Sequence, residues 1–157
     1  MIFELWPALI AGALAGFAMV IMRTLMKKMG MNLRMSITRM WGVMMGLSGS
    51  AATFIGFWIH IVVSALIALL YVWIFGLIGV TGYYWVWGIL GGFIHWFIAG
   101  VFMGMIPTMQ SGTETEPAPG FLISKLGGQE VVTFIIGHLM YGVLTALLYA
   151  YFAGLYA

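Results

Sequence analysis

Three histidines carry the most evident chemistry in this chain, because each lies within a long apolar stretch. An ionisable side chain placed in such a stretch is costly unless it is hydrogen-bonded or used as a ligand, so it marks a candidate functional site. At helical spacing, His60 shares a face with Ser64 and His138 shares a face with Thr145, while His95 follows a row of glycines. We therefore predict that all three imidazoles point into the protein and lie at similar depth.

These imidazoles allow several chemistries. His60 and His138 could supply both axial ligands of a haem b. With His95 they could form a three-nitrogen metal site for copper or zinc, and a single imidazole could hold the magnesium of a chlorophyll-type pigment. The structural alternative is a neutral imidazole hydrogen-bonded across helices to Ser64, Thr145, a tyrosine or a backbone carbonyl. No haem motif of fixed spacing decides between them.

Fourteen methionines are the second feature of the chain. Thioethers are soft ligands that select Cu(I), but methionine is also an adaptable packing residue. Their spacing of three and four favours helix packing over copper handling. The residues concerned are Met19, Met22, Met26, Met29, Met31, Met103, Met105 and Met109.

The acidic residues point away from catalysis by this chain on its own. Glu4, Glu114, Glu116 and Glu130 lie at the ends of apolar stretches or between them. Proton relays and hydrolytic acid/base pairs place carboxylates inside the protein. The sequence also has no Ser-His-Asp, HExxH, P-loop or GxGxxG arrangement.

The elements that carry these residues are membrane-spanning helices. Of the 157 residues, 64% are hydrophobic and 6% are charged, far fewer charges than a water-soluble domain has. Four stretches reach the length of about 20 residues that a span requires, and we expect them to form one domain over 1–157. They are 5–27, 52–80, 83–108 and 131–156. The second and third should be antiparallel neighbours, and a net charge of +2 gives no reason to expect nucleic acid.

Charge predicts the orientation of the spans in a prokaryotic inner membrane. Five of the six basic residues lie between Arg23 and Arg39, so the first connection should be cytoplasmic and both termini should be on the other side. We expect Arg23 to reach the headgroups, and Tyr71 and Tyr149 to belong to the opposite interfacial belt. The segment 32–47 fits a short interfacial helix, and Pro119 with Gly120 should turn the chain.

An internal repeat organises the spans. His60–Gly76 resembles His138–Gly154, and Gly12–Phe17 resembles Gly88–Phe93. The chain is therefore predicted to be an all-α membrane protein built from a tandem two-helix repeat, 5–80 and 83–157, with a pseudo-twofold axis along the membrane normal. Small residues at spacing four, Gly12 and Gly16 in one unit and Gly88 and Gly92 in the other, predict that the first and third spans pack together.

Two motifs carry a family resemblance over most of the chain. They are the run His95–Pro107, with its H-W-x-x-A-G-x-x-M-G pattern, and Pro119–Phe121 followed by Gly137–Gly142. In these the chain resembles a group of small four-span prokaryotic membrane proteins, to which the YagU-like inner-membrane proteins are distantly similar. The resemblance implies the four-span topology and assigns no activity.

We therefore expect a small non-catalytic accessory subunit of a larger respiratory or photosynthetic membrane complex. Its partners would be the bilayer and other membrane subunits, and His60, His95 and His138 would be the candidate residues for a haem b, a pigment or a metal. The alternative is a transporter or channel for a small solute, supported by the parallel repeat. Copper handling ranks third.

Overall fold

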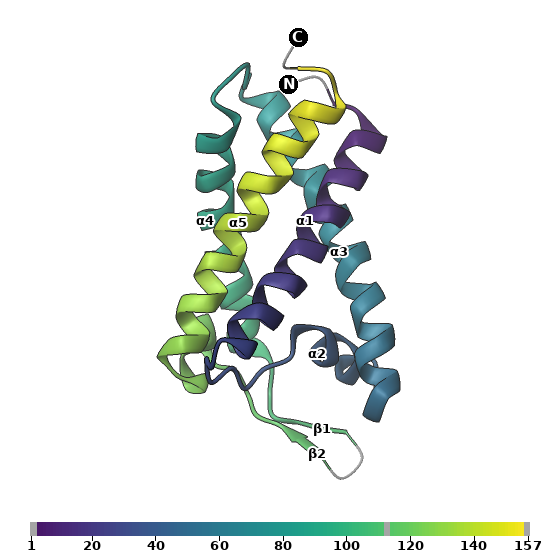
Figure 1. Ribbon diagram of the computed structural model, residues 1–157, viewed down its shortest axis with the longest axis vertical. Helices are drawn as coiled ribbons and strands as arrows, with labels where there is room; N and C mark the ends of the chain where they lie inside the picture. Colours follow the sequence, from purple (N-terminus) through teal and green to yellow (C-terminus); the bar gives the residue numbers. More distant parts are fainter. Residues whose placement is uncertain (1–2, 112–113, 156–157) are drawn as a thin grey trace.

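The computed structural model describes residues 3–111 and 114–155 of the chain. The elements, in chain order, are α1 (Leu5–Lys28), α2 (Ile37–Met44), α3 (Gly49–Leu77), α4 (Tyr84–Met105), β1 (Met109–Ser111), β2 (Glu114–Glu116), the short 3-10 helix η1 (Phe121–Leu126) and α5 (Gly128–Phe152). The long helices run side by side, and α2 and the β1–β2 hairpin lie together at one end (Figure 1). The fold is helical apart from this small antiparallel hairpin.

The helices α1, α3, α4 and α5 are long and apolar enough to cross a membrane. Their bounds match the predicted spans to within a few residues, so the all-α fold with four candidate spans is confirmed. Large apolar side chains are exposed along the outer faces of all four helices. Such a surface suits a lipid bilayer rather than water.

Glycines allow close helix contacts, but the predicted pairing of α1 with α4 is wrong. A Cβ added to Gly12 would lie 2.6 Å from the carbonyl oxygen of Ser64 in α3, and one added to Gly92 would lie 2.5 Å from that of His138 in α5. Thus α1 packs on α3, and α4 packs on α5. A row of small residues predicts a close neighbour without saying which helix provides it.

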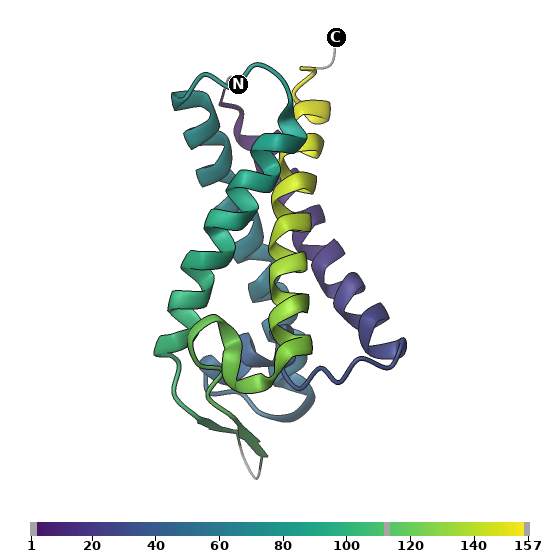
Figure 2. The same cartoon turned by 90° about the vertical axis from the view of Figure 1, so that its left-hand side faces the viewer.

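The expected close pairing of α3 with α4 is also wrong over most of their length. The contacts of α1 are with α3 and α5, and those of α4 are with α5 and η1. Near their connecting turn, α3 and α4 meet through Tyr71 and Phe75, whose rings face Gly91 and Trp87. Figure 2 shows α4 and α5 side by side at the front, with α3 behind. Further from the turn, a cavity lies between α3 and α4.

The helix contacts agree with the predicted repeat in one respect and differ from it in another. In each unit, the first long helix packs on the second through glycines at matching positions, Gly12 and Gly88. The extensive packing of α1 on α5, however, has no counterpart between α4 and α3. The tandem repeat and its pseudo-twofold axis therefore stay predictions.

The segment predicted to be a short helix forms α2, which packs tightly on α3. Ser36 caps it, its Oγ accepting a hydrogen bond from the backbone N–H of Arg39 at 3.3 Å. A Cβ added to Gly56 of α3 would collide with the backbone of α2. The Arg39 guanidinium binds Glu116 at 2.5 Å, which joins the hairpin to α2. The predicted turn is present at Gly120, whose φ is +74°.

Tyr71 and Tyr149 are not belt residues. Tyr71 is 7% exposed and Tyr149 is 0% exposed, so both lie in the core. The Tyr149 hydroxyl accepts a hydrogen bond from the backbone N–H of Glu4 at 3.1 Å, which ties the start of α1 to α5. A tyrosine near a helix end faces either the interface or the core, and its position along the chain does not say which.

Candidate functional site

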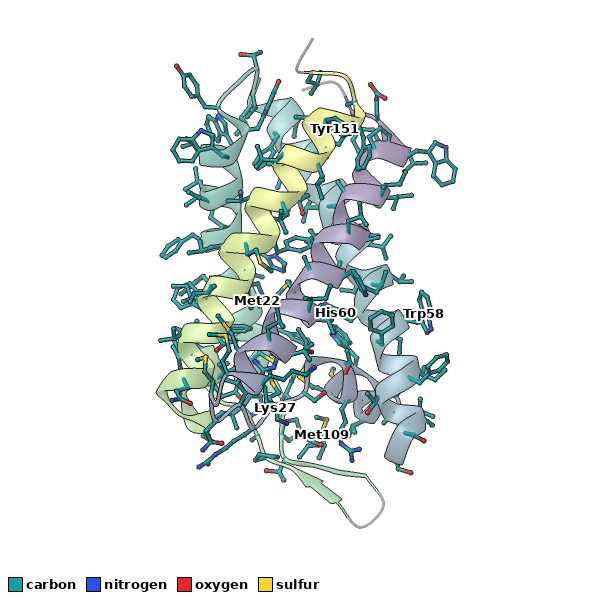
Figure 3. The ribbon with its side chains drawn as sticks, viewed as in Figure 1. Met22, Lys27, Trp58, His60, Met109 and Tyr151 are labelled. Atoms are coloured by element: carbon teal, nitrogen blue, oxygen red, sulfur yellow. The ribbon has the colours of Figure 1, made fainter. Side chains whose placement is uncertain are left out.

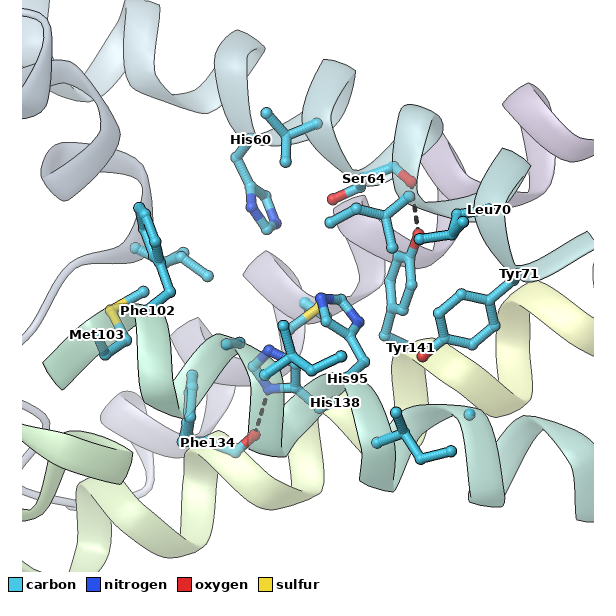
Figure 4. Close-up of a pocket in the computed structure, with 18 of the residues that line it drawn as sticks. His60, Ser64, Leu70, Tyr71, His95, Phe102, Met103, Phe134, His138 and Tyr141 are labelled. Carbon is cyan, nitrogen blue, oxygen red and sulfur yellow. Dashed lines mark hydrogen bonds between the residues drawn. The ribbon is translucent and has the colours of Figure 1, made fainter. Parts of the chain in front are cut away.

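The three histidines come from three helices and line one cavity. His60 of α3, His95 of α4 and His138 of α5 all face a space of about 500 Å³ (Figure 4). On α3, His60 points into the bundle, while Trp58 projects from its outer face (Figure 3). The prediction that the imidazoles point inward is therefore confirmed.

The cavity is long and follows the helices. Its lining extends from His60 of α3 to Ile78, the residue that follows this helix, a rise of about 27 Å at 1.5 Å per residue. At the end near the α3–α4 turn, Phe75 and Trp87 narrow it. At the other end it is covered by residues from α2 and the segment before it, Met35, Ile37, Met40 and Trp41.

The cavity opens sideways between α3 and α4. Several of its lining residues are also large apolar side chains with 40% or more of their surface exposed. From α3 and the residue after it these are Leu70, Ile74 and Ile78, and from α4 they are Leu90, Ile94, Ile98 and Phe102. A molecule could thus enter between the two helices without crossing the end of the bundle.

His138 is held in an orientation typical of a ligating histidine. Its Nδ1 lies 2.7 Å from the carbonyl oxygen of Phe134, one turn earlier in α5. A carbonyl only accepts, so Nδ1 carries the hydrogen, and the lone pair is on Nε2. Metal-ligating histidines commonly donate their second N–H to a backbone carbonyl in this way. The bond also pairs Nδ1 without any ligand, as the structural alternative expected.

His60 ties two helices together. Its Nε2 lies 3.2 Å from the carbonyl oxygen of Gly16 in α1. By the same reasoning Nε2 donates and Nδ1 is left as an acceptor. Two of the three imidazoles therefore bond to backbone carbonyls, and neither bonds to Ser64 or Thr145, the side-chain partners that the sequence suggested.

His95 lies in an aromatic cluster that contains two unpaired polar atoms. Its ring centroid is 4.7 Å from that of His138, 5.4 Å from that of Tyr141 and 6.0 Å from that of Tyr71. The Tyr141 hydroxyl donates to the carbonyl oxygen of Ser64 at 2.5 Å. By contrast, the buried Tyr71 Oη and His95 Nδ1 have no hydrogen-bond partner. Each such atom leaves about 1–3 kcal/mol of desolvation uncompensated.

No family model, curated protein or solved structure matches this chain. The likeness to YagU-like proteins therefore stays a prediction, and the residues themselves must support any function.

The described residues do not assemble a metal centre from protein ligands alone. Among them, no three His, Asp or Glu side chains lie close enough together to hold a metal ion, so the three imidazoles do not form the three-nitrogen site considered above. The methionines are also dispersed. Met103 is 6% exposed in a packed cluster, whereas Met29 is 83% and Met105 is 77% exposed.

A buried ion pair lies next to Met35 at the α2 end of the bundle, and the sequence analysis missed it. The Arg23 Nη2 lies 2.9 and 2.7 Å from the two carboxylate oxygens of Glu130, which is 0% exposed in the first turn of α5. The backbone N–H of Met35 donates to Glu130 at 2.7 Å, and the Arg23 side chain donates to the Met35 carbonyl oxygen. The prediction that Arg23 reaches the headgroups is therefore wrong. Together these bonds fix Met35 at the cavity wall.

Proposed function

We propose that this protein is a small non-catalytic membrane protein that takes an apolar ligand from the bilayer into the α3–α4 cavity, as an accessory subunit of a larger respiratory or photosynthetic complex. The observation that carries the proposal is the cavity itself, which is long, apolar and open on the side of the helices. Its volume of about 500 Å³ falls within the usual range of ligand sites.

The lining favours binding over reaction. It consists of aliphatic, aromatic and methionine side chains with a few polar groups, and no charged residue is among the lining residues. Ligand sites typically combine such apolar walls with a small number of convergent polar groups. Holding a ligand needs no acid/base pair, so the lining suits an accessory role.

Mass spectrometry on protein extracted in a mild detergent tests this function. We expect a small apolar molecule to accompany the wild-type chain at a fixed stoichiometry. A bulky substitution on the cavity wall, Ile67→Trp, should exclude it. The same substitution at Val62, which is 56% exposed and outside the lining, is the matched control. A ligand-free wild type, or equal ligand content in both variants, would contradict the proposal.

A tetrapyrrole is the second candidate, and the orientation of His138 favours it. With Nδ1 bonded to the Phe134 carbonyl, Nε2 is free to ligate the iron of a haem b or the magnesium of a pigment. His60, whose Nδ1 is left as an acceptor, would be the second residue to hold the iron of a haem. The purified protein should then be coloured, and His138→Ala should remove the band. A colourless protein that carries another apolar ligand would contradict tetrapyrrole binding and agree with the first proposal.

Copper handling and solute transport stay predictions, without an observation in their favour.

We also propose that the α2 end faces the cytoplasm of a prokaryotic cell. Support comes from the basic residues, which all belong to this end: Arg23, Lys27 and Lys28 at the end of α1, Arg34 and Arg39 around α2, and Lys125 in η1.

A further inference from the structure

We propose that the ligand is an uncharged lipid with a quinone-type ring as its head, and that Tyr71 and His95 bind that head. This inference rests on the function proposed above and names the ligand class. Its basis is the pair of unpaired polar atoms in the aromatic cluster, Tyr71 Oη and His95 Nδ1.

The uncharged lining disfavours a phospholipid headgroup inside the cavity. A charged headgroup in an apolar cavity needs a counter-charge, and no Lys, Arg, Asp or Glu is among the lining residues. The nearest charged pair at the α2 end, Arg23 and Glu130, is already neutralised by its own contact. The head must therefore be neutral, and must offer hydrogen-bonding atoms to the cavity wall.

The unpaired atoms suit a head that carries carbonyl or hydroxyl oxygens. Tyr71, which is 7% exposed, has a hydroxyl that can donate to either kind of oxygen. A neutral imidazole nitrogen such as His95 Nδ1 donates in one tautomer and accepts in the other. It can therefore donate to a quinone carbonyl, or accept from a quinol hydroxyl. Both redox forms of one ring would be satisfied, and binding requires no electron transfer.

The shape of the site suits a flat ring with a long tail. The rings of Tyr71, His95 and Tyr141 meet edge to face, with centroids 5.4–6.0 Å apart, and aromatic walls favour planar heads. Beyond this cluster, Leu70, Ile74 and Ile94 line the side opening. An isoprenoid tail could lie along these aliphatic side chains and leave between α3 and α4 into the acyl chains.

Titration of purified protein in nanodiscs with decylubiquinone tests the inference, with binding followed by tryptophan fluorescence quenching. Tyr71→Phe should weaken binding about tenfold, as expected for one lost hydrogen bond. Without ligand, the same variant should melt at or above the wild-type temperature, because it removes an unpaired buried hydroxyl. Tyr149→Phe is the control, since its hydroxyl lies outside the cavity lining and is already paired with Glu4. It should lower the melting temperature and leave decylubiquinone affinity unchanged.

Three results would overturn the inference. One is equal decylubiquinone affinity in wild type and Tyr71→Phe. Another is an apolar ligand without a ring head in the extracted protein, displaced by Ile67→Trp, which would leave the proposed function intact. The third is a helix of a partner subunit that crosslinks into the α3–α4 opening through Ile94→Cys, a variant whose cysteine would be unique in the chain. Failure of both proposals would appear as a ligand-free protein that binds no decylubiquinone.

Discussion

At the scale of single residues, the candidate site consists of three imidazoles and two tyrosines that line one cavity. How far each of them could be predicted depended on how unusual the residue is in its surroundings. The histidines were found because an imidazole within an apolar stretch stands out in any sequence. Tyr71 was wrongly predicted to lie at the membrane interface, because tyrosine suits both an interface and a core. Its unpaired hydroxyl is a property of the packed cavity, which no spacing rule reveals.

The first prediction at the residue scale concerns Gly142, where α5 packs closely on α4. A Cβ at this position would lie 2.7 and 2.8 Å from the backbone nitrogen and Cα of Gly92 in α4. The helices must separate to accommodate it, so Gly142→Ala should lower the free energy of unfolding by about 1–3 kcal/mol. Unfolding in mixed micelles with increasing SDS measures the change. Gly128→Ala is the control, because nothing lies within 4 Å of its added Cβ, and a value close to that of Gly142→Ala would disprove the argument.

At the scale of elements, the existence of the helices was predictable and their partners were not. Length and hydropathy alone define a span. In a membrane protein, however, both the packed face and the lipid-facing face of a helix are apolar, so periodicity does not separate them. The rows Gly12–Gly16 and Gly88–Gly92 therefore predicted tight packing correctly, while the choice of α4 as the partner of α1 was wrong.

Variants of the Arg23–Glu130 ion pair test how much this contact stabilises the α2 end of the bundle. Removing one partner leaves the other charge buried and unpaired, so Arg23→Met and Glu130→Leu should each cost about 3–5 kcal/mol. The double variant Arg23→Met/Glu130→Leu should lose much less than the sum, because it leaves no buried charge. SDS-induced unfolding measures the free energy of unfolding of the wild type, the two single variants and the double variant. Lys28→Met, at an exposed position, should change stability by about 0.5 kcal/mol or less, and strictly additive losses would contradict a coupled pair.

At the scale of the whole molecule, the side opening lies between α3 and α4, two helices that the predicted repeat would bring together. The contact of α1 with α5 is extensive, while the corresponding contact of α4 with α3 is replaced by the cavity. The predicted repeat would give α4 and α3 the same contact that α1 and α5 make. The opening lies where this expected contact is missing. Because of this gap, the imidazoles of α3, α4 and α5 line a cavity that is accessible from the side.

This architecture also makes a prediction about topology. Because the basic residues belong to the α2 end, that end should face the cytoplasm, and the α3–α4 turn should lie on the opposite side. The chain has no cysteine, so Thr81→Cys in that turn and Ser124→Cys in η1, both at exposed positions, form a matched pair. In intact spheroplasts, a membrane-impermeant maleimide should label Thr81→Cys at once and Ser124→Cys only after permeabilisation. The reverse pattern would contradict the proposed orientation, because it would place the basic residues of the α2 end outside the cytoplasm.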